Sequence, residues 1–108
     1  MPTDQITTWT GDFGREYTDR NPQSISELDA LYERSFGIRR SDLNAAFLPG
    51  IPRETSVLEV GSNVGVQLMA LEAMGFHRLH GIEIQRYALA RAKELIPQAR
   101  LLQGSAFE

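Results

Sequence analysis

The spacing of apolar residues in the second half of the chain alternates between two periods. Short runs of apolar and β-branched residues predict strands at residues 56–61, 79–84 and 100–104, and the first run is typical of a buried strand. Between them, residues 64–74 and 86–95 carry apolar side chains at helical spacing, and each segment is followed by glycine or proline. The predicted order is therefore β-α-β-α-β.

The preceding segment has helical spacing throughout. Ser24 and Glu27 form a capping box ahead of an apolar stripe that runs to Phe36, and Gly37 follows at the usual position of a helix-ending glycine. A further helix is predicted at residues 41–48, and a Pro-Gly-Ile-Pro segment ends it.

The first 23 residues contain two glycines and an Asn-Pro pair, which argue against a long regular element. Trp9, Phe13 and Tyr17 nevertheless recur at every fourth position, on one face of a helix. We predict a short helix or irregular arm here. Packing in the core is the expected role of the three aromatic side chains, and a lid over a ligand is the alternative.

Alternating strands and helices are typical of half of a doubly wound α/β fold. Right-handed crossovers place the strands in the order 3-2-1, with their carboxyl ends at the edge where such folds bind ligands. We therefore predict an α/β fold, the N-terminal half of a Rossmann-like doubly wound parallel sheet, preceded by N-terminal helices. Residues 1–54 are expected to form the helical cap or arm, and residues 55–108 the ligand-binding half.

Composition narrows the functional classes. The 108 residues carry a formal net charge of −3 and no cysteine, so nothing indicates a nucleic-acid or anionic-membrane partner, and Cys-based zinc sites and disulfides are excluded. The chain has no secretion signal at its start and no apolar stretch of membrane-spanning length. We expect a cytoplasmic protein without a metal site, a nucleic-acid partner or a membrane anchor.

A glycine loop follows the first predicted strand, where residues 59–65 read Glu-Val-Gly-Ser-Asn-Val-Gly. The turn from strand into helix needs residues that adopt positive φ, and glycine and asparagine do so most readily. We expect free N–H groups at the helix opening, near residues 63–65, to face an anionic group of a ligand. Asn63 and Val66 replace the second and third glycines of the dinucleotide fingerprint, so a carboxylate fits better than a pyrophosphate.

Two acidic residues narrow the ligand further. Glu83 lies at the end of the second predicted strand, 22 residues after Gly61, where an acid can accept both ribose hydroxyls. Glu59, directly before the loop, would repel a pyrophosphate and suit a cationic ligand. A ligand with adenosine, a carboxylate, an ammonium and a sulfonium, but no phosphate, matches these features, and that ligand is S-adenosylmethionine.

These segments resemble the motifs of the class I S-adenosylmethionine-dependent methyltransferases. Residues 57–65 are similar to their first motif, hydrophobic-L-E-[VI]-G-x-G-x-G, residues 81–84 to the second, and residues 104–106 to the third. The resemblance implies methyl transfer from S-adenosylmethionine, with cofactor contacts in the three motifs. Tyr17 and Arg20 are added as candidates because of their own side chains, an aromatic ring that could cover the cofactor and a guanidinium that could pair with its carboxylate. The candidate contacts are Glu59, Gly61, Ser62, Asn63, Gly65, Glu83, Ile84, Ser105, Ala106, Tyr17 and Arg20.

Some of these positions depart from the family pattern, and others have an explanation that involves no ligand. Asn63 replaces the middle glycine, and Ser105 replaces an aspartate, which puts the usual carboxylate contact to adenine in doubt. Arg20 could pair with the methionine carboxylate, with solvation at the surface as the alternative. The pattern of residues 9–21 and the Gly-Ser-x-Phe ending also resemble methylases associated with pseudaminic acid biosynthesis, which implies a small-molecule acceptor such as a surface-sugar precursor.

No catalytic base is identified. His77 and His80 are expected at the edge of the sheet opposite the glycine loop, away from the chemistry. We expect the chain to be the cofactor-binding portion of a longer enzyme, with an exposed edge at its first strand. By itself it is expected to bind the cofactor weakly or not at all, and to transfer no methyl group. An NAD-dependent oxidoreductase fragment, a non-enzymatic nucleotide-binding module and an interaction domain with a relic loop remain the alternatives.

Overall fold

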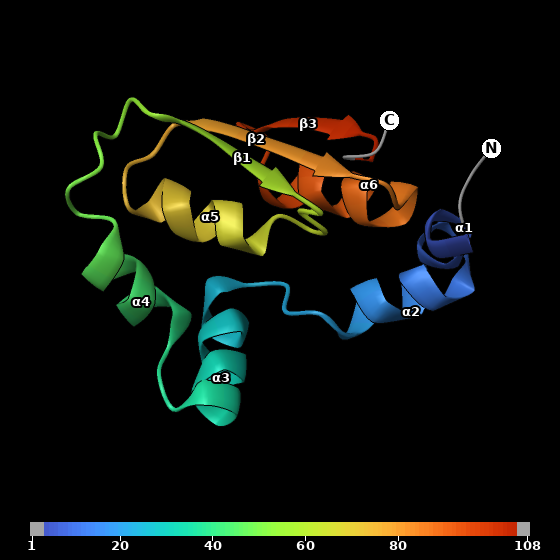
Figure 1. Cartoon of the computed structure of the whole chain (residues 1–108), viewed down its shortest axis with the longest axis horizontal. Coiled ribbons are helices and arrows are strands. Elements are labelled where there is room, and N and C mark those ends of the chain that lie inside the picture. Colours follow the sequence, from blue (N-terminus) through green and yellow to red (C-terminus); the bar gives the residue numbers. More distant parts are fainter. Residues whose placement is uncertain (1–3, 106–108) are drawn as a thin grey trace.

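The computed structural model describes residues 4–105. Helices α5 and α6 lie along the sheet, α1 and α2 lie beyond the carboxyl ends of the strands, and α3 and α4 extend away from the sheet (Figure 1). None of the helices in the described range is long and apolar enough to cross a membrane. In chain order the elements are α1 (Asp4–Thr10), α2 (Asp12–Arg20), α3 (Ile25–Phe36), α4 (Arg40–Phe47), β1 (Ser56–Val60), α5 (Val66–Ala73), β2 (Arg78–Glu83), α6 (Arg86–Leu95) and β3 (Arg100–Gln103).

The three strands form one parallel sheet in the order β1-β2-β3. This is the predicted 3-2-1 order counted from the other edge, so the predicted β-α-β-α-β arrangement and the N-terminal helices are confirmed. The register pairs Val57 with Leu79 and Gly81 with Leu101. It brings the carboxyl ends of all three strands to one edge of the sheet.

The core lies between the sheet and the two helices that cover it. Both crossover helices pack on the same face, as right-handed connections require for consecutive neighbouring strands. Their apolar side chains meet the residues that alternate toward them from β2 and β3. The buried cluster consists of Leu68, Leu71, Phe76, Leu79, Leu89, Ala92, Ile96 and Leu101.

The other face of the sheet is uncovered in the described part of the chain. Leu58, Val60 and Leu102 point to it and are 58%, 56% and 69% exposed. The prediction of a buried first strand is therefore wrong, because that prediction needs helices on both faces and the structure has them on one. The exposed edge at β1 is confirmed, since within residues 4–105 this strand pairs with β2 alone.

Short-range features of the sequence, such as capping residues and glycines, predicted the helix ends well. The Ser24 hydroxyl accepts a hydrogen bond from the backbone N–H of Glu27 at 3.1 Å, and Gly37 ends α3 with a φ of 75°. The carboxylate of Glu27 accepts from the backbone N–H of Gln23, one residue before its capping-box partner. Helix α6 has the predicted bounds, whereas α5 begins two residues late because Gly65 is left-handed.

The first two helices, here called the N-terminal arm, break at Gly11 and fold back on each other. The Trp9 ring lies edge-on to Phe13 and Tyr17, with centroid distances of 5.4 and 5.0 Å. Phe13 is 49% and Tyr17 39% exposed, so the expectation that these aromatics pack in the core is wrong. They form their own cluster at the surface of the arm instead.

Candidate functional site

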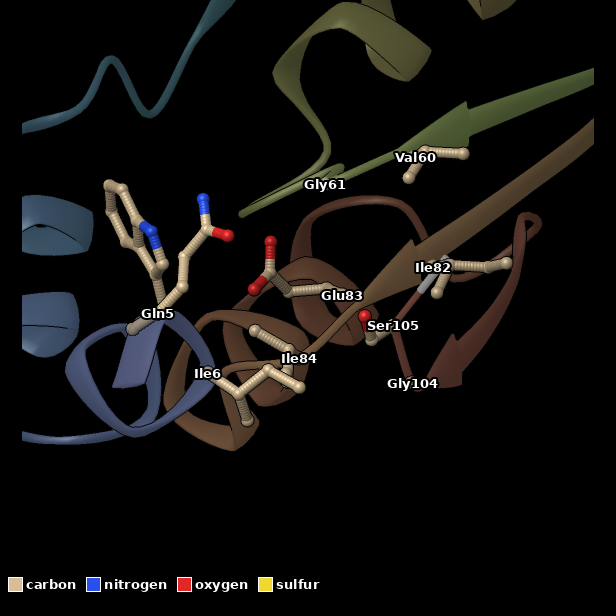
Figure 2. A pocket seen from close by; sticks show the side chains of 10 residues that line it. Gln5, Ile6, Val60, Gly61, Ile82, Glu83, Ile84, Gly104 and Ser105 are labelled. Atoms are coloured by element: carbon tan, nitrogen blue, oxygen red, sulfur yellow. The ribbon is translucent and has the colours of Figure 1, made fainter. Parts of the chain in front are cut away.

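Two adjoining cavities lie between the N-terminal arm and the carboxyl ends of the strands, and together we call them the cleft. Their volumes are about 170 and 320 Å³, and they share Trp9, Gly61, Glu83 and Ile84. The smaller cavity, shown in Figure 2, is otherwise lined by Gln5, Ile6, Val60, Ile82, Gly104 and Ser105. The larger is otherwise lined by Gly14, Tyr17, Thr18, Asn21, Asn63 and Gln85.

The glycine loop has the backbone conformation that its sequence predicts. Gly61, Asn63 and Gly65 adopt φ values of 71°, 50° and 84°. A Cβ on Gly61 would meet no described atom within 4 Å, so this glycine serves the turn and leaves the cleft open. A Cβ on Gly65 would lie 3.0 Å from the side chain of Ile96, so this glycine also serves the packing of the loop against α6.

The N–H groups of the loop are already used within the chain. The N–H groups of Gly61 and Ser62 donate to the carbonyl oxygen of Ile82, at 2.8 and 3.1 Å. The N–H of Asn63 donates to Glu83 Oε1 at 2.7 Å. The N–H groups of Val64 and Gly65 bond within the loop, to Asn63 Oδ1 at 3.0 Å and to the carbonyl oxygen of Ser62 at 2.9 Å. The expectation of free N–H groups near residues 63–65 is therefore wrong. The side chains of Asn63 and Glu83 take two of the donors that a bound anion would need.

Glu83 occupies the centre of the cleft. It ends β2, is 7% exposed, and lines both cavities. One carboxylate oxygen accepts from the N–H of Asn63 at 2.7 Å and the other from the N–H of Gln85 at 2.8 Å. Figure 2 shows the carboxylate pointing toward Gln5 of α1. Since a carboxylate has about four acceptor positions, two of them stay open to hydroxyl donors from a ligand.

Glu59 does not lie in the cleft. Its side chain belongs to the half-buried face of β1, beneath the sheet, and lines neither cavity of the cleft. Burial raises the pKa of Glu59 to about 7; the positive charge of Arg40 opposes this shift and the negative charge of Glu83 adds to it. Its Oε1 atom has no hydrogen-bond partner among the described residues. A direct ligand contact by Glu59 therefore finds no support in its placement.

Ser62 is likewise turned away from the cleft. It is 5% exposed, and its hydroxyl has no hydrogen-bond partner in residues 4–105. A Cβ on Gly81 would lie 2.7 Å from the Ser62 hydroxyl oxygen. Ser62 thus fills the space that Gly81 leaves on the next strand, which is a packing role.

The other predicted contacts divide between the cleft and the outer surface. Tyr17, Ile84 and Ser105 line the cleft. Arg20 borders a different hollow, on the outer side of the arm between α2 and α3. Ala106 lies outside the described residues.

Several cleft residues were missed by the sequence analysis, among them Gln5, Asn21 and Gln85. Gln5 and Asn21 line the cleft from the arm and the segment after it. Gln85 caps α6 with its side chain, and its Nε2 donates to the carbonyl oxygen of Trp9 at 3.0 Å. Its place directly before a predicted helix could have indicated a cap, although glutamine is not a usual residue there.

The two histidines lie where they were expected. His77 and His80 line a hollow of about 190 Å³ at the amino ends of β2 and β3, together with Arg78, Gln98 and Arg100. This edge is opposite the cleft. Among residues 4–105 no group of three His, Asp or Glu side chains could hold a metal ion.

Comparison with protein-family models, with curated proteins and with solved structures finds no match to this chain.

Proposed function

We propose that the chain binds S-adenosylmethionine in the cleft and is the cofactor-binding part of a class I methyltransferase, in which this sheet forms half of a Rossmann-like doubly wound fold. The acceptor is a small molecule, such as a sugar or a surface-polysaccharide precursor, and the enzyme is cytoplasmic. The acceptor class rests on the motif resemblance alone.

The position of Glu83 carries the proposal. A buried carboxylate, oriented by two backbone N–H groups and facing a cavity, is preorganised to accept two hydroxyl donors. A ribose diol supplies two such donors at neighbouring carbons. Because the carboxylate does not have to reorient, the ligand does not have to offset that cost.

The smaller cavity suits an adenine ring. Val60, Ile82 and Ile84 provide apolar surface there, and Gly104 and Ser105 follow β3 at its mouth. The larger cavity is more polar and extends toward Tyr17 on the arm and Asn21 directly after it. An adenosyl ligand with its ribose at Glu83 would place its base in the first cavity and its amino-acid end in the second.

The hydrogen bonds of the loop favour a ligand without phosphates. A pyrophosphate is normally held by free N–H groups of the loop and the helix that follows. Here the N–H groups of residues 61–65 donate within the chain. The carboxylate of S-adenosylmethionine would then meet polar side chains such as Tyr17 of the arm and Asn21 directly after it. This speaks against the oxidoreductase alternative.

Bound S-adenosylmethionine would supply an electrophilic methyl group on its sulfonium sulfur. The residues of this chain would bind and orient that cofactor. Glu83 would bind its ribose, and the apolar residues at the sheet edge, together with Trp9, would contact its adenine ring. Residues of the arm, Trp9 among them, form one side of the cleft. We assign no general base to the described residues.

Trp9 provides the test, because it is the sole tryptophan of the chain and it lines both cavities. Titration with S-adenosylhomocysteine is expected to change the Trp9 fluorescence saturably. NAD⁺ at the same concentrations is expected to leave it unchanged. Tighter binding of NAD⁺ would favour the oxidoreductase alternative, and the absence of any response to S-adenosylhomocysteine would refute the proposal.

A further inference from the structure

The buried side chain of Gln85 joins the end of α1 to the cleft. Gln85 lies in the connection between β2 and α6, and only 5% of its surface is exposed. Its Nε2 donates to the carbonyl oxygen of Trp9 at 3.0 Å and lies 3.4 Å from that of Gly11. Trp9 is in the last turn of α1, where a helix leaves its carbonyl oxygens without intrahelical partners. Gln85 therefore supplies the donor that the end of α1 lacks.

The other polar atoms of Gln85 bond to the start of α6 and to Glu83. Its Oε1 accepts from the backbone N–H of Tyr87 at 3.1 Å and so caps α6. Its backbone N–H donates to one carboxylate oxygen of Glu83 at 2.8 Å. The same residue thus fixes the start of α6, the orientation of the proposed diol-binding carboxylate and the end of α1.

Two other links between the arm and α6 involve more exposed side chains. The Tyr87 hydroxyl donates to Asp19, and the Arg15 guanidinium lies 4.8 Å from the centre of the Tyr87 ring. Tyr87 is 39% exposed and both partners are exposed, so these contacts compete with water. Asn63 adds a part-buried bond to the Thr18 hydroxyl at 3.2 Å. Of these links, only the one from Gln85 reaches the last turn of α1.

We propose that Gln85 is a positioning residue, which holds the N-terminal arm closed over the cleft and thereby sets the affinity of the cleft for its ligand. The ligand part of this inference rests on the function proposed above, whereas the anchoring of the arm does not. With the Gln85 bond made, Trp9 forms a wall of both cavities. Without it, α1 is held in place only through α2, whose own links to the rest of the chain involve Asp19, Arg15 and Thr18, and the cleft loses that wall.

The variant Gln85→Glu separates anchoring from capping. Glutamate has nearly the same shape, and one of its oxygens can still accept from the N–H of Tyr87. Its other oxygen replaces the amide donor and faces the carbonyl oxygens of Trp9 and Gly11, which it cannot bond when ionised. Gln98→Glu is the control for the added charge, because it makes the same chemical change at an exposed position on the opposite edge of the sheet.

Amide hydrogen exchange over residues 4–20 reports on anchoring, and Trp9 fluorescence reports on the ligand. In Gln85→Glu we expect exchange of the arm to accelerate by at least about tenfold, with the strand amides unchanged. We expect its affinity for S-adenosylhomocysteine to fall by a factor on the order of ten. Gln98→Glu is expected to match the unmodified chain in both measurements.

Each part of the inference can fail separately. Unchanged exchange of the arm in Gln85→Glu would overturn the anchoring. Faster exchange together with an unchanged affinity would overturn the positioning role. If the unmodified chain binds no adenosyl compound, the proposed function fails and the ligand part of this inference fails with it, while the exchange measurement still decides whether Gln85 anchors the arm.

Discussion

The carboxylate of Glu83 accepts a hydrogen bond from the backbone N–H of Asn63 at 2.7 Å. This bond joins the end of β2 to the turn that follows β1, and it fixes a carboxylate oxygen beside the left-handed loop. The acid and the loop therefore act as one unit. Changes to either are expected to affect the cleft in ways that can be measured.

Removing the charge of Glu83 should weaken ligand binding. In Glu83→Gln an amide NH₂ group replaces one of the two carboxylate oxygens. This group faces the backbone N–H of Asn63 or Gln85, with which it cannot bond, and it cannot accept a hydrogen bond from a ribose hydroxyl. We expect the affinity for S-adenosylhomocysteine to fall at least tenfold, or about 1.4 kcal/mol, as measured by calorimetry. Glu72→Gln, an exposed substitution on α5, is the control and should keep the affinity. Equal affinities for the two variants would remove Glu83 from the site.

The role of Gly61 can be separated from its conformation by a comparison with Gly37. Both glycines have positive φ, at 71° and 75°, and a Cβ on either would meet no described atom within 4 Å. Alanine at either position should cost about 1–2 kcal/mol in the free energy of unfolding, measured with urea. Only Gly61→Ala should also weaken binding of the ligand. A similar loss of binding in Gly37→Ala would show that the effect comes from stability.

Gly14 is required for the fold of the arm. A Cβ there would lie 1.9 Å from the carbonyl oxygen of Trp9, whereas a Cβ on Gly11 would lie 3.4 Å from its nearest neighbour outside the adjoining residues. In Gly14→Ala the two helices of the arm cannot keep their contact, at a cost of about 1–3 kcal/mol. We expect the Trp9 emission to shift to longer wavelength in Gly14→Ala and to stay unchanged in Gly11→Ala. The same spectrum for both variants would contradict the close approach.

Glu59 should make stability depend on pH. Burial holds its pKa at about 7 in the folded chain, above the ordinary value of 4.5. The folded state therefore binds this proton more tightly, and the resulting stability is present below the unfolded pKa and is lost as the pH rises through 7. Glu59→Gln should raise the free energy of unfolding at pH 8 by about 1–3 kcal/mol, with little effect at pH 4. Urea denaturation at both pH values checks this, and an equal change at both would contradict it.

Signals that depend on neighbouring residues were readable from the sequence, and signals that depend on distant ones were not. The cap at Ser24, the bounds of α6 and the positive φ of the loop are set within a few positions. The order of the strands follows from crossover handedness. The position of Glu83 in the cleft follows from the meeting of strand ends at one edge.

The errors concern partners far along the chain. The N–H groups of residues 61–63 donate to Ile82 and Glu83 on the neighbouring strand, which the loop sequence does not reveal. The exposure of Leu58 and Val60 depends on which faces of the sheet are covered. Gln85 meets Trp9 across 76 positions, so a local reading of either segment gives no sign of the contact.

A crystal structure of the chain with S-adenosylhomocysteine tests the account most directly. We predict that the ribose hydroxyls donate to the carboxylate of Glu83, with the adenine beside Ile84 and the amino-acid end directed toward the arm. A ligand bound outside the cleft, or a carboxylate of Glu83 that makes no contact with the ribose, would contradict the account.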